Sequence, residues 1–200
     1  MSPRIRAAEM TVAQTVPYTR SESPSGKSLL MVGDSTAYGV GAESPALSTA
    51  GRVGEVLGAS VENHARSGGK TRELLAQLGK VQRTSYDVIV IQMGANDITH
   101  FSSSEQTQVE LDQALRRAKE LAPTVVLLTC GDIGNAPLWP WPLGHLYTYR
   151  AQVFREKFMT TAKEHGVLYV DLFTKPDVFT TDAARYYAPD GLHLSGEGYG

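Results

Sequence analysis

Five short runs of apolar or β-prone residues, separated by longer stretches with helical period, constrain this chain more than any other feature of its sequence. Several of these runs are apolar throughout instead of alternating, which is typical of strands in a parallel sheet covered on both faces. The pattern predicts an α/β fold, a three-layer α/β/α sandwich around a five-stranded parallel sheet with right-handed crossovers. The predicted strands are Leu29–Val32, Ser60–Asn63, Val88–Gln92, Val125–Thr129 and Val167–Asp171.

Four stretches between the strands have the spacing of amphipathic helices. The third shows apolar side chains on one broad stripe, from Val109 to Ala118. Two long connections, residues 130–146 and 172–192, break the alternation, and long loops after parallel strands tend to carry function. The predicted helices are Ala46–Leu57, Thr71–Gln82, Glu105–Leu121 and Tyr147–His165.

The length and composition favour a single domain. A chain of 200 residues with 42% hydrophobic side chains can bury one sizeable core. The segment from Thr19 to Lys27 is rich in Ser, Pro and Gly, which is typical of a connecting arm. We therefore predict an N-terminal arm over residues 1–27 and a folded domain over residues 28–200.

The charge balance and the short apolar runs exclude two classes of partner. The formal net charge is −2, which provides no basis for binding the phosphate backbone of a nucleic acid. No apolar run approaches the roughly 20 residues of a transmembrane helix, so we expect no integral membrane segment. The single cysteine, Cys130, and the lack of a hydrophobic leader before residue 28 fit a cytoplasmic protein, and equally an exported or anchored one whose leader has been removed.

Three motifs that suggest a cofactor or a metal are incomplete. Gly26-Lys27-Ser28 resembles the end of a phosphate-binding loop, but Ser21 occupies the position of the required glycine. Gly39-Val40-Gly41 begins like a dinucleotide-binding fingerprint, but the third glycine is replaced by Ser44. The five histidines lack the His-Glu-x-x-His spacing of zinc enzymes. We expect no cofactor and no metal.

Small polar residues follow several of the predicted strands. Gly33-Asp34-Ser35 follows the first strand, Asn63–Gly69 the second and Gly94–Asp97 the third, and Asp190-Gly191-Leu192-His193 lies near the end of the chain. The carboxyl ends of parallel strands meet at one edge of a sheet, so these groups should lie close together. Ester hydrolysis by serine needs a nucleophile, a base, a group that orients the base, and oxyanion donors. Residues suited to all these roles are present.

Taken in order, these four clusters resemble the motif blocks of the SGNH hydrolases, also called the GDSL family of esterases and lipases. The resemblance extends from Leu29 to Gly200. It implies a flavodoxin-like fold, a small-molecule ester as substrate and no cofactor. It also implies that Ser35 is the nucleophile, His193 the general base and Asp190 the residue that orients the histidine.

The same resemblance implies an oxyanion hole formed by the backbone N–H groups of Ser35 and Gly68 and the side-chain amide of Asn96. A glycine at position 68 leaves the backbone open to substrate, and Asn96 supplies a donor that cannot ionise. Two roles remain open for Trp139 and Trp141, which either line an acyl pocket or anchor a packed loop. We expect Asp34 and Asp97 to fix loops without taking part in the chemistry.

Two departures from the family pattern occur near the end of the chain. Leu194 follows the histidine where the family usually has proline, and residues 196–200 resemble the start of a closing helix, which we expect to be cut short. Besides an esterase, the residues fit a thioesterase or lysophospholipase with the same mechanism, or an inactive acyl or carbohydrate binder. They specify neither the acyl chain, nor the alcohol, nor the oligomeric state.

Overall fold

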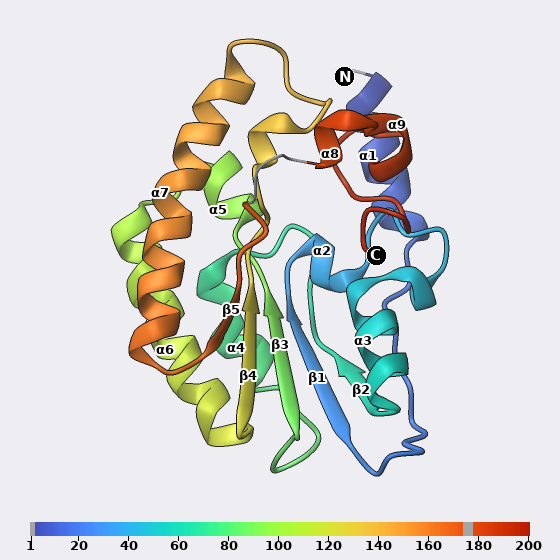
Figure 1. Ribbon diagram of the computed structural model, residues 1–200, viewed down its shortest axis with the longest axis vertical. Helices are drawn as coiled ribbons and strands as arrows, with labels where there is room; N and C mark the ends of the chain where they lie inside the picture. Colours follow the sequence, from blue (N-terminus) through green and yellow to red (C-terminus); the bar gives the residue numbers. More distant parts are fainter. Residues whose placement is uncertain (1–2, 174–177) are drawn as a thin grey trace.

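The computed structural model describes residues 3–173 and 178–200 and shows a five-stranded parallel sheet with helices on both faces (Figure 1). The strand order is β2-β1-β3-β4-β5, so β1 lies between β2 and β3. The predicted fold class is confirmed, and each strand bound lies within one residue of its predicted position. The strands are β1 (Ser28–Gly33), β2 (Ser60–Asn63), β3 (Val88–Gln92), β4 (Thr124–Leu128) and β5 (Leu168–Val170).

Helices connect and cover these strands. Figure 1 shows α4, α6 and α7 on one side of the sheet and α3 on the other. The α-helices are α1 (Pro3–Gln14), α2 (Ser35–Tyr38), α3 (Thr49–Leu57), α4 (Leu74–Leu78), α5 (Ala95–Thr99), α6 (Ser104–Leu121), α7 (Leu143–Glu164), α8 (Val178–Thr181) and α9 (Ala183–Tyr186). The 3₁₀ helices are η1 (Pro45–Leu47), η2 (Thr71–Glu73) and η3 (Ile133–Asn135).

Strand β1 explains why the molecule has three layers. All six of its residues are buried, and successive side chains point to opposite faces of the sheet. Leu30 and Val32 belong to the larger core, which also contains side chains of α4, α6 and α7. Leu29 and Met31 belong to a smaller core with side chains of α2 and α3. An uninterrupted apolar strand therefore needs helices on both faces, as the sequence pattern indicated.

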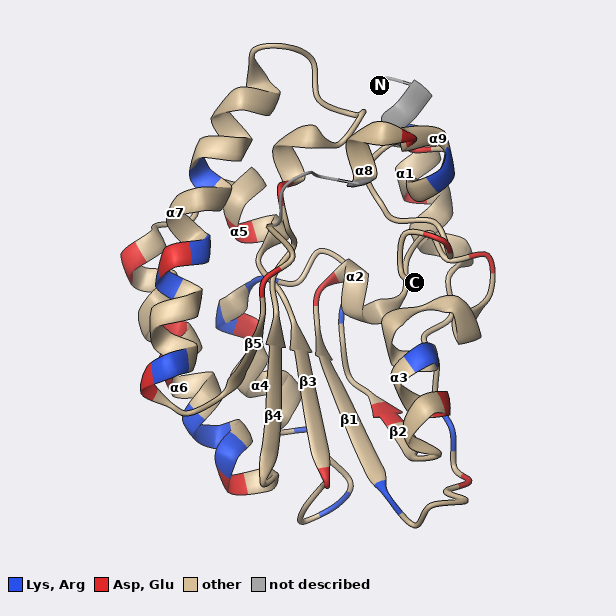
Figure 2. Ribbon diagram, viewed as in Figure 1, with Lys and Arg blue, Asp and Glu red and all other residues tan. Residues whose placement is uncertain are grey.

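Charged residues occupy the outer surfaces of the helices. Figure 2 shows positive and negative segments interspersed along α6 and α7, whereas β3 and β4 carry no charged residue. Exposed ion pairs on α6 join Arg116 to Asp112 and Arg117 to Glu120. On these two helices the charges of both signs are mixed, so they present no continuous basic surface.

Three predicted helices differ from the structure at their ends. The predicted helix at 46–57 is divided, because the Ser48 hydroxyl accepts a hydrogen bond from the Gly51 N–H and begins α3 after η1. The predicted helix at 71–82 ends at Leu78, followed by Gly79. Helix α7 begins at Leu143, so its first turn lies inside the predicted loop 130–146.

The predicted arm contains a helix that the sequence pattern did not indicate. Helix α1 spans most of the first half of the arm, and none of its described side chains is buried. Because a surface helix is recognised by its buried apolar stripe, a helix without one leaves no periodic signal. The second long connection, 172–192, contains α8 and α9; its residues 174–177 lie outside the described residues.

The close approach of β1 to β3 yields a first prediction. Gly33 has φ +147°, and a Cβ at this position would lie 1.9 Å from the Gln92 carbonyl oxygen. We expect Gly33→Ala to lower the free energy of unfolding by about 3 kcal/mol or more, because the backbone must shift to relieve the overlap. Chemical denaturation measures this loss.

Gly26→Ala is the matched control. Gly26 also has a positive φ, +73°, but a Cβ there would meet no atom within 4 Å. Its cost should be limited to backbone strain, about 1–2 kcal/mol. Equal losses of stability in the two variants would contradict the steric argument.

Candidate active site

Four segments that are distant in sequence line one pocket of about 190 Å³ at the carboxyl ends of the strands. Ser35 follows β1, Gly68 follows β2, Asn96 follows β3, and Leu192 and His193 lie near the end of the chain. The structure therefore brings together the predicted nucleophile, base and oxyanion donors. Asp190 lies directly behind His193 and is fully buried.

Ser35 is the first residue of the short helix α2. The N-cap of this helix is Asp34, whose Oδ1 accepts hydrogen bonds from the Thr36 N–H at 2.9 Å and the Thr36 hydroxyl at 2.6 Å. Gly39 ends the helix in the left-handed conformation. Since Asp34 caps the helix, the Ser35 hydroxyl remains free of that role, and the serine is held between a buried strand and a capped helical turn.

Asp34 is a buried carboxyl group directly before Ser35. Burial raises its pKa above the ordinary value, while the hydrogen bonds from Thr36 act in the opposite direction. Its Oδ2 has no hydrogen-bond partner among the described residues. The contacts of Oδ1 with Thr36 are those of the loop-fixing residue expected from the sequence.

Gln77, which the sequence analysis did not identify, fixes the end of β1. Its Oε1 accepts a hydrogen bond from the Gly33 N–H at 2.7 Å, and its Nε2 donates to the Gly33 carbonyl oxygen at 2.9 Å. The side chain is buried on α4. A glutamine within an apolar helix face was the only available signal, because its partner lies 44 residues away.

His193 and Asp190 form a buried pair. The His193 Nδ1 lies 2.7 Å from the Asp190 Oδ2, and the Asp190 Oδ1 accepts the N–H groups of Leu192 at 2.8 Å and His193 at 3.0 Å. Burial alone would raise the pKa of Asp190, but the hydrogen bonds from His193 and Leu192 hold it below its ordinary value. An ionised carboxylate at Nδ1 assigns the ring proton to that nitrogen and leaves Nε2 as an acceptor.

Three N–H donors face the same pocket. Among the described residues, the backbone N–H groups of Ser35 and Gly68 have no protein acceptor. The Asn96 Nδ2 donates one hydrogen to the Gly69 carbonyl oxygen at 3.1 Å, which orients the amide and leaves its second hydrogen for a ligand. An oxyanion requires N–H donors of this kind.

Gly68 has φ +76°, and a Cβ at this position would meet no protein atom within 4 Å. From the sequence, a glycine was expected at this position because it leaves the backbone open to substrate. The structure adds a second reason, since other residues adopt this backbone conformation only with strain.

Two further contacts hold the Asn96 loop. The buried Asp97 Oδ2 accepts the Thr71 N–H at 2.9 Å and the Thr71 hydroxyl at 2.8 Å. Arg150 of α7 donates to the Ile98 carbonyl oxygen at 2.9 Å and to that of Ser102 at 2.8 Å. Asp97 matches its expected structural role, whereas Arg150 was not identified from the sequence.

The two tryptophans do not line this pocket. The Trp139 Nε1 donates to the Ile133 carbonyl oxygen at 2.9 Å, and its ring packs edge-on against Tyr147 at a centroid distance of 4.8 Å. Trp141 is 80% exposed. Of the two alternatives, Trp139 therefore fits the packed loop anchor, and the structure gives neither residue a place in an acyl pocket formed around Ser35.

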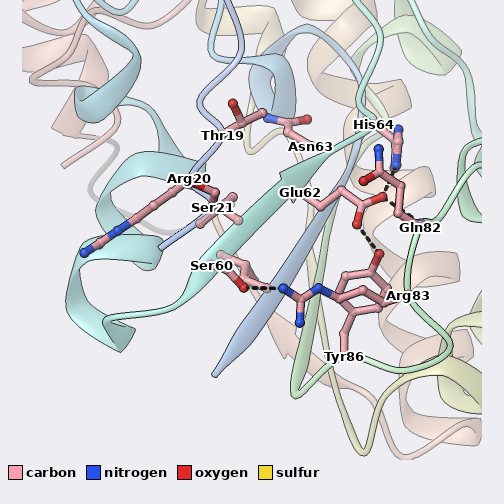
Figure 3. Close-up of a pocket in the computed structure, with 12 residues that line it drawn as sticks. Thr19, Arg20, Ser21, Ser60, Glu62, Asn63, His64, Gln82, Arg83 and Tyr86 are labelled. Carbon is pink, nitrogen blue, oxygen red and sulfur yellow. Dashed lines mark hydrogen bonds and ion pairs between the residues drawn. The ribbon is translucent and has the colours of Figure 1, made fainter. Parts of the chain in front are cut away.

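A larger cavity of about 600 Å³ lies beside the edge strand β2 and contains none of these groups (Figure 3). Figure 3 shows Glu62 between His64 and Tyr86, and its carboxylate accepts hydrogen bonds from both side chains. Burial together with Glu62 raises the pKa of Tyr86 to about 12. In this cavity Glu62, His64 and Tyr86 are paired with one another, whereas the smaller pocket places a serine beside a histidine that is held by a buried aspartate. The smaller pocket is therefore the candidate active site.

Two features of other protein classes are absent from residues 3–173 and 178–200. No group of three His, Cys, Asp or Glu side chains is arranged to hold a metal ion. No helix in this part of the chain is long and apolar enough to cross a membrane.

Comparisons with known proteins agree with the fold. A family model described as the GDSL-like Lipase/Acylhydrolase family matches residues 31–200. The GDSL-like esterase Rv1075c of Mycobacterium tuberculosis is 30% identical over 132 residues, which cover 62% of this chain and only 42% of that protein.

Solved structures of similar fold are less related in sequence. An acetylxylan esterase, Axe2 of Geobacillus stearothermophilus, superposes with a TM-score of 0.61 at 23% identity and covers 88% of this chain and 90% of that one. Phospholipase A1 of Streptomyces albidoflavus NA297 gives a TM-score of 0.67 at 18% identity, with coverage of 88% and 95%. At these identities the likeness concerns the fold.

The depressed pKa of Asp190 predicts how stability depends on pH. A carboxyl group whose pKa is lowered in the folded state stabilises the protein above its ordinary pKa of 3.8, and this contribution is lost as the pH falls through the folded value. Asp190→Asn should therefore lower the free energy of unfolding by about 1.5–3 kcal/mol at neutral pH, the usual value of a hydrogen bond to a charged group. The difference from the parent should shrink as the pH approaches 3.

Urea denaturation of both proteins between pH 3 and pH 7 measures this difference. A loss of stability that is the same at every pH would show that the ionised form of Asp190 does not support the fold.

Proposed function

Because the chain belongs to the GDSL-like lipase/acylhydrolase family, we propose that it is a serine esterase that hydrolyses carboxylic esters through an acyl-enzyme on Ser35. One observation carries the proposal. The buried Asp190–His193 pair lines, through His193, the same pocket as the Ser35 hydroxyl and three unpaired N–H groups. The esterase and lipase names of the similar proteins support the same reaction class.

In the first step, the Ser35 oxygen attacks the carbonyl carbon of the ester while its proton moves to the His193 Nε2. The electron pair of the carbonyl double bond moves to the carbonyl oxygen. This oxyanion accepts hydrogen bonds from the N–H groups of Ser35 and Gly68 and from the Asn96 amide. The donors are already fixed by the folded backbone and by the Asn96–Gly69 hydrogen bond, so they need little reorganisation during the reaction.

The carbonyl double bond then re-forms and the bond to the alkoxy group breaks. His193 returns its proton to the leaving alcohol, which leaves the acyl group on Ser35. A water molecule gives a proton to His193 and attacks the acyl carbonyl carbon. The bond between that carbon and the Ser35 oxygen then breaks, His193 returns the proton to the Ser35 oxygen, and the carboxylic acid is released. Asp190 stays ionised throughout, which agrees with its lowered pKa, and its charge stabilises the imidazolium ion formed in each half of the reaction.

Among the described residues, Ser35 and His193 share the pocket without a hydrogen bond between Oγ and Nε2. Catalytic hydrogen bonds are often long in a free enzyme and shorten when substrate is bound. The mechanism therefore requires the Ser35 hydroxyl and the His193 Nε2 to come within hydrogen-bond distance when substrate is bound.

Ser35→Ala tests the nucleophile. Removing the attacking oxygen should reduce kcat on p-nitrophenyl acetate by about 10⁴ to 10⁶, since the remaining members of a triad cannot replace it. A fluorophosphonate should label the parent at Ser35, which peptide mapping by mass spectrometry identifies.

Ser67→Ala is the control, because it removes another hydroxyl from the same pocket. Its activity should stay within about tenfold of the parent. Ser35→Ala activity in that range, or a label on another residue, would exclude Ser35 as the nucleophile.

Asn96→Ala tests the oxyanion donor. An interaction formed with the developing charge should affect kcat more than KM, and the expected loss in kcat is about 10² to 10³. The variant also loses the hydrogen bond to Gly69, so the melting temperature is measured alongside the kinetics. An unchanged kcat would leave Asn96 with only a structural role.

A further inference from the structure

Helix α1 contributes a side chain to the candidate active site. Val12 lines the same pocket as Ser35 and His193, although it lies on α1, before the first strand of the sheet. No catalytic role is available to valine. Its side chain can only affect the space that is available to a substrate.

The inward face of α1 consists of small side chains. Ala7, Ala8, Thr11 and Val12 are half-buried, and their spacing places them on one side of the helix. Thr15, directly after the end of α1, is half-buried as well. The opposite side is exposed, including Met10 at 61%. No described side chain of α1 belongs to either hydrophobic core.

The threonine side chains of this segment form hydrogen bonds within the segment and not with other described parts of the domain. The Thr11 hydroxyl donates to the Ala7 carbonyl oxygen at 2.9 Å, and the Thr15 hydroxyl donates to the Thr11 carbonyl oxygen at 2.7 Å. Both hydrogen bonds lie within the segment itself. Neither core packing nor side-chain hydrogen bonds of the described residues explain the position of α1. Its contact with the pocket does suggest an explanation.

The size of the pocket indicates what this contact does. Its volume, about 190 Å³, is below the roughly 300–1,000 Å³ of pockets that bind drug-sized ligands. Leu192 and Ile133 supply further apolar surface to the lining. With α1 in place, the pocket is suited to small esters.

We propose that α1 is a wall of the substrate pocket and that Val12 is a specificity-determining residue that limits the enzyme to short-chain esters. This inference rests on the proposed esterase function. In hydrophobic pockets one methylene group changes kcat/KM by about 10- to 200-fold, so one side chain on the wall is sufficient to set a size limit.

The experiment compares Val12→Trp with Val16→Trp in the full chain. Val16 is the same residue type shortly after α1 and is 65% exposed, so the control adds the same bulk outside the pocket. Two substrate series are measured, p-nitrophenyl esters from acetate to octanoate and acetate esters of alcohols of increasing size. Melting temperatures show that each variant is folded.

The parent should favour the shortest esters. Val12→Trp should lower kcat/KM for the larger members of one series at least about tenfold more than for its smallest member, while Val16→Trp keeps the parent's ratio. Val12→Ala should shift the ratio in the opposite direction, toward larger esters. The series that responds identifies whether Val12 faces the acyl group or the alcohol.

An active parent whose size preference is the same in Val12→Trp and Val16→Trp would overturn the proposal and leave the esterase function intact. A parent that hydrolyses no ester and takes no fluorophosphonate label at Ser35 would overturn both. The activity and labelling of the parent protein therefore distinguish a failure of the pocket-wall proposal from a failure of the esterase proposal.

Discussion

The parallel pairing of β1 with both β2 and β3 is the constraint on which the candidate site depends. In this register Met31 lies opposite Asn63, and Gly33 lies opposite Gln92. The three strands therefore end within two residues of one another, and the loops that carry Ser35, Gly68 and Asn96 leave the sheet at one edge. Gly33 is also hydrogen bonded to Gln77 through both of its backbone polar groups, so the segment that carries Ser35 begins from a fixed point.

The sequence was sufficient to predict the elements whose signal is local. Apolar runs such as Val88–Gln92 define buried strands, and the order of the polar clusters after them defines which loops meet. The Asp190–His193 pair was predictable because both residues lie in one tight turn, where Oδ1 also accepts two backbone N–H groups of the same turn. The family model over residues 31–200 agrees with this part of the analysis.

The missed residues act through contacts that are distant in sequence. Gln77 holds Gly33 from 44 residues away, and Arg150 holds Ile98 from 52 residues away. A polar side chain on a helix is most often solvated, so its type and spacing do not reveal a buried backbone partner. Trp139 illustrates the opposite case, since an aromatic residue in a long loop suggested a substrate pocket but packs against Tyr147.

The proposed catalytic groups and the proposed wall of the pocket are held in different ways. Ser35 and His193 are buried and are held by a capped helical turn and by the hydrogen bond to Asp190, and Asn96 is oriented by its hydrogen bond to Gly69. Val12 is presented by a helix whose described side chains add nothing to either core. A substitution on the inward face of α1 can therefore change the volume of the pocket without disturbing the strands that position the reacting groups. On this account the groups proposed for the chemistry lie at the edge of the sheet, and the size of the accepted ester is limited by a helix whose described side chains lie outside both cores.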